Sequence, residues 1–238
     1  MILPLRLEAV TFAAGGRTLI EPLTLAIDAG PSTIILGANG AGKSVLMRLM
    51  HGLLAPTSGR VSWNGGSGRD MRRKQAMVFQ RPVMLRRSAL ANVTYALEVA
   101  GVSAKGERER LALEALGEVG LAHLAHRAAR VLSGGEQQRL ALARAWALHP
   151  DVIFFDEPTA SLDPSATREI ESVIKAFDAA GTKIVMATHN LGQARRLGDE
   201  VIYLHQGRVA ERAAVDRFFS QPATAEAAAF IKGELPWA

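Results

Sequence analysis

The fold of this chain is decided by the stretch Gly37-Ala38-Asn39-Gly40-Ala41-Gly42-Lys43-Ser44. Before it lies an apolar run, Thr33-Ile34-Ile35-Leu36, which predicts a buried strand, and after it apolar residues recur at helical spacing. Glycines let a backbone wrap closely around a polyphosphate and point successive N–H groups at it. A helix that begins at about Gly42 directs the positive end of its dipole at the same anion. The stretch therefore predicts a phosphate loop between a strand and a helix.

The end of this loop carries two side chains that suit a nucleotide and its metal ion. Lys43 has the length to reach the β- and γ-phosphates, and the Ser44 hydroxyl is a ligand for Mg²⁺. Val45 follows them and completes the predicted nucleotide-binding set. The alternative is a chance glycine-rich turn with an exposed lysine, which leaves the flanking strand and helix unexplained.

Composition limits the class of protein. The chain has 238 residues, enough for one large domain or for a domain with a small appendage. It is 48% hydrophobic and 21% charged, as is typical of globular proteins, and it has no apolar run long enough for a membrane span. Its first residues lack the pattern of a secretory signal. With no cysteine, disulfides and thiolate metal sites are excluded.

The charge balance is basic, with a net charge of +5 from 28 basic and 23 acidic residues. Such a surface could bind nucleic acid. However, the basic residues are scattered, and none of their small groups is interleaved with aromatic residues. We therefore interpret them as solvated faces, and we expect no nucleic-acid partner.

The N-terminal part predicts short strands. Residues 5–28 alternate as two or three strands around a turn at 13–16, and 61–63 form a further strand before a glycine-rich, flexible loop at 64–68. Phe12 stands at the end of the first strand. Its ring either stacks on an adenine or belongs to the core, and the sequence leaves both readings open.

Polar residues follow three further predicted strands. Gln80 comes after the strand 76–79, Asp156-Glu157 after the strand 152–155, and His189 after the strand that ends at Thr188. An open parallel sheet places its ligands at the carboxyl ends of its strands, so we expect these side chains at one edge. Asp156 is the natural Mg²⁺ partner. Glu157, pointing the other way along the strand, is free to orient or deprotonate a water.

Adjacent acids such as Asp156 and Glu157 also occur as two solvated residues at a turn, but their mutual repulsion favours a nearby cation. We expect His189 to lie near the γ-phosphate, because it belongs to the same sheet edge. The other histidines have no comparable placement and receive no role.

Residues 81–130 change character and predict a helical insert, with helices over 88–100 and 107–119. A helix to about residue 148 follows, and Ser133 and Glu136 have the spacing of a capping box at its start. Gly134 and Gly135 beside that cap leave backbone N–H groups accessible, which predicts a second anion-facing surface. Asp163 is expected to cap the next helix, with a proline at its first position.

The C-terminal part predicts a closing hairpin and a helical tail. Residues 201–204 and 208–211 form the hairpin around a Gln-Gly turn. The alanine-rich tail, 213–238, is expected to be helical to about Ile231.

Together these segments resemble the ATP-binding subunit of an ABC transporter, from about residue 5 to residue 212. The phosphate loop alone is shared with many NTPases. The specific part is the order of LSGGEQQR at 132–139, an aliphatic strand ending in Asp156-Glu157, then Ser161-Leu162-Asp163, and then His189. Gln80 matches the glutamine of the family's Q-loop. No motif is broken, which implies a catalytically competent copy.

The resemblance implies an α/β fold: a P-loop NTPase core with a mainly parallel sheet, an N-terminal antiparallel β subdomain and an inserted α-helical subdomain. The whole chain, 1–238, is then a single ABC ATPase domain. Its core with the β subdomain spans 5–80 and 140–212, its helical subdomain 81–139, and its helical tail 213–238. A large C-terminal regulatory domain is not expected.

The resemblance also implies a homodimer that closes head to tail on ATP. Each ATP lies between the phosphate loop of one copy and residues of the other, in trans: Ser133, Gly134, Gly135, Glu136 and Asp163. The catalytic residues are Glu157, which polarises water, His189, which contacts the γ-phosphate, and Gln80. The Mg²⁺ ligands are Ser44, Gln80 and Asp156.

The implied partners are membrane-spanning permease subunits, which dock near Gln80 and residues 81–87, and indirectly a periplasmic solute-binding protein. The chain would be peripheral, on the cytoplasmic face of the plasma membrane. The residues at 79–83 and 233–237 look most like those of ATP-binding subunits of bacterial importers for small oxyanions, especially tungstate. Phosphate, molybdate and polar amino acids are the next candidate solutes.

Two alternatives stay open. One is a soluble ABC-type ATPase that acts on nucleic acid or ribosomes, although that class usually carries a long coiled-coil insert or two ATPase units. The other is an exporter or cell-division ATPase of the same fold, which the sequence does not separate from an importer.

Overall fold

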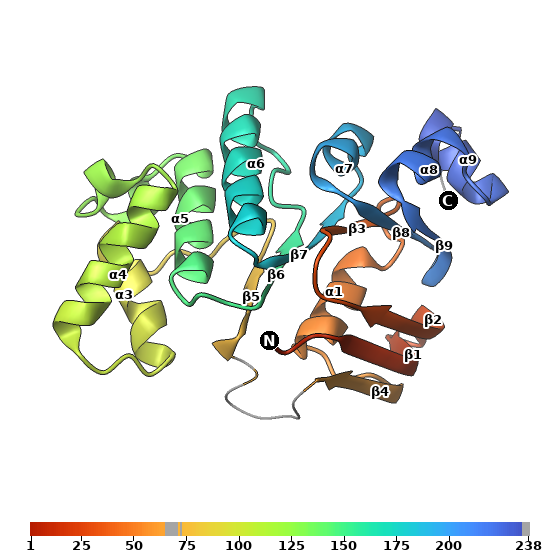
Figure 1. Cartoon of the computed structure of the whole chain (residues 1–238), viewed down its shortest axis with the longest axis horizontal. Coiled ribbons are helices and arrows are strands. Elements are labelled where there is room, and N and C mark those ends of the chain that lie inside the picture. Colours follow the sequence, from red (N-terminus) through yellow and green to blue (C-terminus); the bar gives the residue numbers. More distant parts are fainter. Residues whose placement is uncertain (65–70, 72, 235–238) are drawn as a thin grey trace. The chain divides into compact units, whose positions relative to one another are not determined.

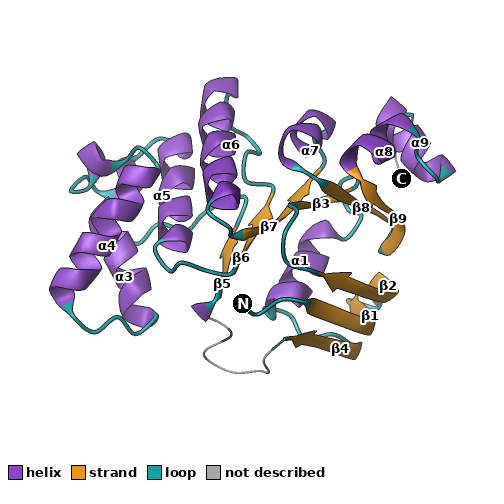
Figure 2. Cartoon of the chain, viewed as in Figure 1, coloured by secondary structure: helices purple, strands orange, loops and turns teal. Residues whose placement is uncertain are grey.

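The computed structural model describes residues 1–64, 71 and 73–234 (Figure 1). The chain divides into two compact units: unit 1 comprises Met1–Met71 and Lys183–Ala238, and unit 2 comprises Arg72–Thr182. Both contain helices and strands, as expected for an α/β protein (Figure 2). Of the predicted flexible loop, 65–68 lie outside the described residues. Within the described residues, no helix is both long and apolar enough to cross a membrane.

Unit 1 begins with an antiparallel sheet of strands in the order β2-β1-β4. Strand β1 spans Leu5–Ala14, β2 spans Arg17–Ile27, and β4 spans Ser58–Trp63. The turn between β1 and β2 is Gly15-Gly16, and both residues have positive φ angles, 57° and 75°. Such a two-residue turn matches the twist of an antiparallel hairpin, so the predicted turn within 13–16 is confirmed.

Unit 1 also holds a run of parallel strands around β3, which spans Thr33–Leu36 and is buried throughout. Strands β7 (Lys183–Thr188) and β8 (Glu200–His205) each pair with β3 in parallel, and β9 (Arg208–Ala214) pairs antiparallel with β8. A strand flanked by parallel neighbours and covered on both faces reads as a continuous apolar run, which is why the sequence located it. Helices α1 (Lys43–His51) and α7 (Leu191–Leu197) follow β3 and β7.

The C-terminal tail is helical to about the predicted residue, with a break that the sequence did not predict. Strand β9 continues to Ala214, and the tail then forms two helices, α8 (Val215–Ser220) and α9 (Ala225–Lys232). The break lies at Gln221, whose φ and ψ of −144° and 66° are not helical. Glu211 on β9 accepts hydrogen bonds from the backbone N–H groups of Ala223 and Thr224, which stabilises the break.

Unit 2 contains the parallel pair β5 (Gln75–Val78) and β6 (Val152–Asp156) together with several helices. The α-helices are α3 (Ala89–Val99), α4 (Lys105–Glu118), α5 (Gly134–Trp146) and α6 (Pro164–Ala179), and two short 3₁₀ helices span Ala122–Leu124 and Ala129–Val131. The predicted helices at 88–100 and 107–119 therefore agree with α3 and α4. The predicted boundary between the helical subdomain and the core, at 139 and 140, falls inside α5, which continues to Trp146. The ring of Trp146 stacks on that of Phe177 on α6 at a centroid distance of 4.1 Å.

Candidate nucleotide-binding site

The phosphate loop lies between β3 and α1 in unit 1. Gly40 and Gly42 have φ angles of 81° and 101°, a left-handed conformation that glycine adopts without steric cost. Gly42 is the N-cap of α1 and has no side-chain hydrogen bond to the first turn of that helix. The N–H groups of the first turn therefore receive no cap from a side chain, and they suit an anion together with the helix dipole.

The Lys43 side chain is 4% exposed and reaches back over the loop. Its Nζ donates to the carbonyl oxygens of Gly37 at 2.9 Å and Ala38 at 3.0 Å. A buried ammonium needs such acceptors because desolvation of an isolated charge is costly. These bonds hold the charge at the loop itself, where a polyphosphate would bind. Ser44 follows on the first turn of α1 and is half-buried.

Phe12 is half-buried on β1, so it does not belong to the fully buried core. Its partner on β2 is Ile20, and the position of a Cβ on Gly42 would lie 2.9 Å from Cδ1 of Ile20. The strand segment opposite Phe12 thus touches the phosphate loop. Whether the ring stacks on an adenine stays a prediction.

His189 follows β7, whose last residue, Thr188, is level with Leu36 in the parallel register. Because the phosphate loop begins directly after Leu36, His189 and the loop leave the same edge of adjacent strands. His189 is exposed, whereas Thr188 is buried and its hydroxyl accepts a hydrogen bond from the Asn190 N–H at 3.1 Å. This part of unit 1 therefore brings together the loop, Lys43, Ser44 and His189, as predicted from the carboxyl edge of a parallel sheet.

In unit 2, the acidic pair stands at the end of β6. Asp156 is the last strand residue and is 5% exposed. Glu157 lies beyond the strand with a φ of +48°, so strand alternation does not set the direction of its side chain, contrary to the basis of the prediction. Its carbonyl accepts a hydrogen bond from the N–H of Ala160 at 3.1 Å. A left-handed backbone at a non-glycine residue is uncommon, and such strain concentrates at functional sites.

Gln80 lies just beyond the end of β5 and is exposed. The parallel register sets Val78 of β5 level with Phe155 of β6, so Gln80 and the acidic pair leave the same edge of this strand pair. The residue before it is fixed, since the Gln138 side chain donates to the carbonyl oxygen of Phe79 at 3.2 Å.

The predicted Mg²⁺ ligands come from both units: Ser44 from unit 1, and Gln80 and Asp156 from unit 2. Across the described ranges of the chain, no cluster of three or more His, Asp or Glu side chains could hold a metal by itself. Mg²⁺ in nucleotide sites uses one or two protein oxygens plus phosphates and water. The hydroxyl of Ser44, the amide oxygen of Gln80 and the nearly buried carboxylate of Asp156 are each an oxygen group of a kind that Mg²⁺ accepts.

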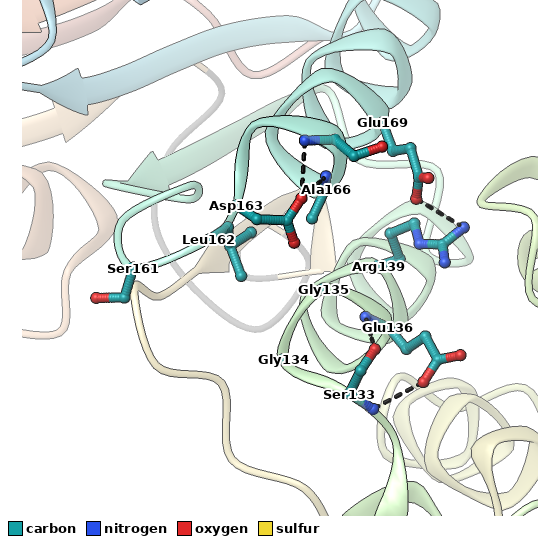
Figure 3. A pocket seen from close by; sticks show the side chains of 11 residues that line it. Ser133, Gly134, Gly135, Glu136, Arg139, Ser161, Leu162, Asp163, Ala166 and Glu169 are labelled. Atoms are coloured by element: carbon teal, nitrogen blue, oxygen red, sulfur yellow. Dashed lines mark hydrogen bonds and ion pairs between the residues drawn. The ribbon is translucent and has the colours of Figure 1, made fainter.

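A pocket of about 360 Å³ lies between the starts of α5 and α6 in unit 2, where the sequence predicts a second anion-facing surface (Figure 3). Ser133 caps α5: its Oγ accepts from the Glu136 N–H at 3.3 Å, and its own N–H donates to Oε2 of Glu136 at 2.7 Å. The predicted capping box is therefore confirmed. Hydrogen bonds from Ser133 hold the pKa of the Glu136 carboxyl below its usual range. The pocket volume is within the range of small-ligand sites.

The other wall of this pocket is the start of α6. Oδ1 of Asp163 accepts from the N–H groups of Ser165 at 2.8 Å and Ala166 at 3.0 Å, which confirms the predicted cap. These two bonds lower the pKa of the Asp163 carboxyl, and the bond from Ala166 has the larger effect. Two helix N-termini thus border one pocket, and both favour negative charge. The trans residues predicted from the resemblance, Ser133–Glu136 and Asp163, all line it.

Several residues that line the pocket received no role from the sequence, among them Arg139 and Glu169. Arg139 and Glu169 form an ion pair at 3.4 Å that joins α5 to α6. Arg139 could have been found, because it lies one helical turn after Glu136 on the same face. Glu169 carries no local signal, since its pairing depends on how two separate helices pack.

Comparisons with known proteins identify the family. Residues 20–160 match the family model described as ABC transporter. The chain is 38% identical to a phosphate import ATP-binding protein of Natronomonas pharaonis, over 97% of this chain and 87% of that protein. It is also 38% identical to a tungstate uptake system ATP-binding protein of Peptoclostridium acidaminophilum, over 86% and 94%.

Solved structures agree on the fold. The structure of cbiO1 from Clostridium perfringens, part of the ABC transporter complex cbiONQ, superimposes with a TM-score of 0.82 at 28% identity and covers 93% of this chain and 92% of that chain. A dimeric, post-hydrolysis structure of the ATP-binding cassette MJ0796 with ADP and Pi gives a TM-score of 0.78 at 31% identity over 89% and 98%. These likenesses confirm the predicted P-loop NTPase core with its antiparallel β and α-helical parts. The chain belongs to the ABC transporter family, among its ATP-binding subunits.

Proposed function

We propose that this chain is the ATP-hydrolysing subunit of an ABC importer and that ATP-driven closure of a homodimer powers uptake of a small solute. The observation that carries the proposal is the phosphate loop. Left-handed Gly40 and Gly42 lead into a helix without a side-chain cap, and the Lys43 ammonium is held at the same loop. Few ligands other than a polyphosphate need this combination of donors.

The residues would divide the work as follows. The loop N–H groups and Lys43 bind and orient the phosphates, Ser44, Gln80 and Asp156 hold Mg²⁺, and Phe12 contacts the adenine. Mg²⁺ would neutralise charge that develops on the transferred phosphoryl group. Glu157 accepts a proton from the attacking water, and His189 donates a hydrogen bond to the γ-phosphate. The left-handed backbone at Glu157 supports this role because such strain concentrates at functional sites.

The pocket at α5 and α6 supports the homodimer. Ser133, Gly134, Gly135, Glu136 and Asp163 would face the nucleotide held by the other copy, since the dipole at the N-terminus of α5, beside Gly134 and Gly135, favours an anion. Among the structural relatives, the MJ0796 cassette with ADP and Pi is dimeric. Closure on ATP would then bring two such pockets against two phosphate loops.

The proposed partners are membrane-spanning permease subunits and, through them, a periplasmic solute-binding protein. The segment after Gln80 suits docking: Val83 is 75% exposed and is surrounded by exposed arginines at 81, 86 and 87. Its backbone is held in place, since Arg144 donates to the carbonyl of Val83 at 2.8 Å and Arg130 to that of Met84 at 3.2 Å. A surface with a fixed backbone and both apolar and basic side chains suits the docking of a segment of another protein. The chain would thus be peripheral to the cytoplasmic face of the plasma membrane.

The solute is proposed to be an oxyanion such as tungstate. Of four relatives at 38% identity, two are named for the oxyanions phosphate and tungstate and two for methionine. The match covers 87% and 94% of the two oxyanion relatives but only 70% of each methionine relative, which favours an oxyanion. ATP hydrolysis by the chain with its permease and solute-binding protein in vesicles tests this. We expect tungstate to stimulate hydrolysis more than phosphate or methionine; preferential stimulation by methionine would overturn the oxyanion proposal alone.

Glu157→Gln tests the hydrolytic role. We expect hydrolysis to fall about 10²-fold or more, because the general base is lost. Nucleotide binding should remain, and size-exclusion chromatography with ATP should show a dimer. Glu114→Gln, a substitution of an exposed acid on α4, is the matched control and should leave the rate unchanged. A variant that hydrolyses ATP at the control rate would contradict the assignment of Glu157, and one that stays monomeric with ATP would contradict the homodimer.

A further inference from the structure

The phosphate loop rests on the backbone of two other segments of unit 1. Gly37 approaches the carbonyl of Leu204 on β8 so closely that a Cβ would collide with it. A Cβ on Gly42 would lie 3.0 Å from the carbonyl oxygen of Leu19 on β2. The loop therefore lies in close contact with the backbones of β2 and β8.

A single residue, Gly207, joins these segments. It lies in the turn between β8 and β9, with a φ of 77°. Its N–H donates to the carbonyl oxygen of Ala41 in the phosphate loop at 3.0 Å, and its own carbonyl accepts from the N–H of Glu21 on β2 at 3.0 Å. One peptide turn thus bonds to the loop on one side and to the antiparallel sheet on the other.

No other residue type fits at this position. A Cβ on Gly207 would lie 2.6 Å from the carbonyl oxygen of Leu19 and 3.3 Å from the N–H nitrogen of Glu21. Both are backbone atoms, so a change of rotamer cannot relieve the contact. The Leu19 carbonyl is the same group that Gly42 approaches, so a shift of this strand segment would be transmitted to the phosphate loop. The positive φ adds a conformational cost for any L-residue with a side chain.

The same strand segment sets the position of Phe12. Ile20, between Leu19 and Glu21, pairs with Phe12 across β1 and β2. Gly207 therefore connects the phosphate loop, which is proposed to bind the phosphates, to the β1–β2 pair, which carries the residue proposed to contact the adenine. A displacement of Gly207 would alter the distance between the phosphate loop and Phe12, which are proposed to bind the same nucleotide.

We propose that Gly207 is a positioning residue that fixes the phosphate loop relative to the β1–β2 sheet and so sets the affinity for nucleotide. The proposal rests on the proposed ATP-binding function. A binding loop tolerates only about 0.5 Å of misplacement before its hydrogen bonds weaken, which is why a backbone collision next to it matters.

The test compares Gly207→Ala with Gly16→Ala by calorimetric titration with ADP and with ATP–Mg²⁺, well below the melting temperature of each variant. Gly16 lies in the β1–β2 turn with a nearly equal φ of 75° and has no atom within 4 Å of its missing Cβ. It therefore reproduces the conformational cost without the collision. We expect nucleotide affinity to fall about 5- to 30-fold in Gly207→Ala, which is the usual effect of losing one or two hydrogen bonds, and to stay at the wild-type value in Gly16→Ala.

Gly207→Asn separates the collision from the backbone strain. Asparagine adopts the left-handed region more readily than alanine but still carries a Cβ. We expect Gly207→Asn to be more stable than Gly207→Ala and to bind nucleotide as weakly. Wild-type affinity in both folded Gly207 variants would overturn the proposal, while a wild-type chain that fails to bind nucleotide would instead overturn the ATP-binding function.

Amide hydrogen exchange of the unaltered chain covers the case in which the Gly207 variants do not fold. Saturation with ADP should raise protection at the Gly207 and Glu21 amides together with that of the phosphate-loop amides, because the three segments are bonded in series. Protection of the loop with no change at Gly207 and Glu21 would overturn the proposal.

Discussion

Gly135 packs against Ala166 so closely that a Cβ on Gly135 would lie 2.9 Å from the Cβ of Ala166. Its neighbour Gly134 has ordinary space, since a Cβ there would lie 3.7 Å from Cδ2 of Leu162. The two adjacent glycines therefore serve different purposes. Gly135 allows α5 to approach α6, and Gly134 leaves the helix start open toward the pocket.

This difference predicts opposite effects of two alanine substitutions on stability. Both gain the helix propensity of alanine, about 1 kcal/mol, but only Gly135→Ala must also overpack against α6. We expect the free energy of unfolding of Gly135→Ala to be about 1–3 kcal/mol below that of Gly134→Ala in urea titrations. Equal urea midpoints for the two variants would contradict this, because they would show that α6 accommodates the added Cβ without loss of stability.

His51 predicts how stability depends on pH. It is the last residue of α1, and burial lowers its pKa from 6.5 to about 4. The unfolded chain therefore binds a proton below pH 6.5 that the folded chain does not, so folding stability is present above that pH and is lost as the pH falls toward 4. We expect a loss of about 1–2 kcal/mol between pH 7 and pH 5.

The measurement is urea unfolding at several pH values in the wild type, His51→Asn and His123→Gln. The lowered pKa values of Glu136 and Asp163 affect stability with the same sign but only below the ordinary pKa values of 4.5 and 3.8, so they do not interfere above pH 5. The slope between pH 7 and pH 5 should flatten in His51→Asn and persist in His123→Gln, whose side chain is exposed. An unchanged slope in His51→Asn would assign the effect to another group.

The features that the sequence predicted correctly are local ones. The strand before the phosphate loop, the glycine turn and the helix after it are each specified by a few adjacent residues, and so are the caps at Ser133 and Asp163. The sequence also predicted that His189 lies at the carboxyl edge of a parallel sheet. The structure adds that its strand, β7, is the direct neighbour of β3, which the sequence did not predict.

The features that it missed depend on contacts between distant segments. Glu157 leaves the strand because its backbone turns at +48°, and nothing in a dipeptide of two acids indicates a left-handed residue. The pairing of Arg139 with Glu169 and the support of the loop by Gly207 likewise require the packed structure. The alanines of the tail favour helix throughout, so the sequence did not predict the break, which a carboxylate on β9 stabilises.

That carboxylate gives the last prediction. Glu211 is 7% exposed, and its oxygens accept from the N–H of Ala223 at 2.9 and 3.0 Å and from the N–H and hydroxyl of Thr224 at 3.2 and 3.3 Å. Glu211→Ala leaves these donors without acceptors, so we expect about 1–3 kcal/mol less stability and faster amide exchange across α9. Glu226→Ala removes only an exposed acid from the first turn of α9 and should cost about 0.3–1 kcal/mol. Equal exchange rates in α9 for the two variants would mean that the aromatic contact of Tyr203 with Phe230, at a centroid distance of 5.2 Å, holds the helix without Glu211.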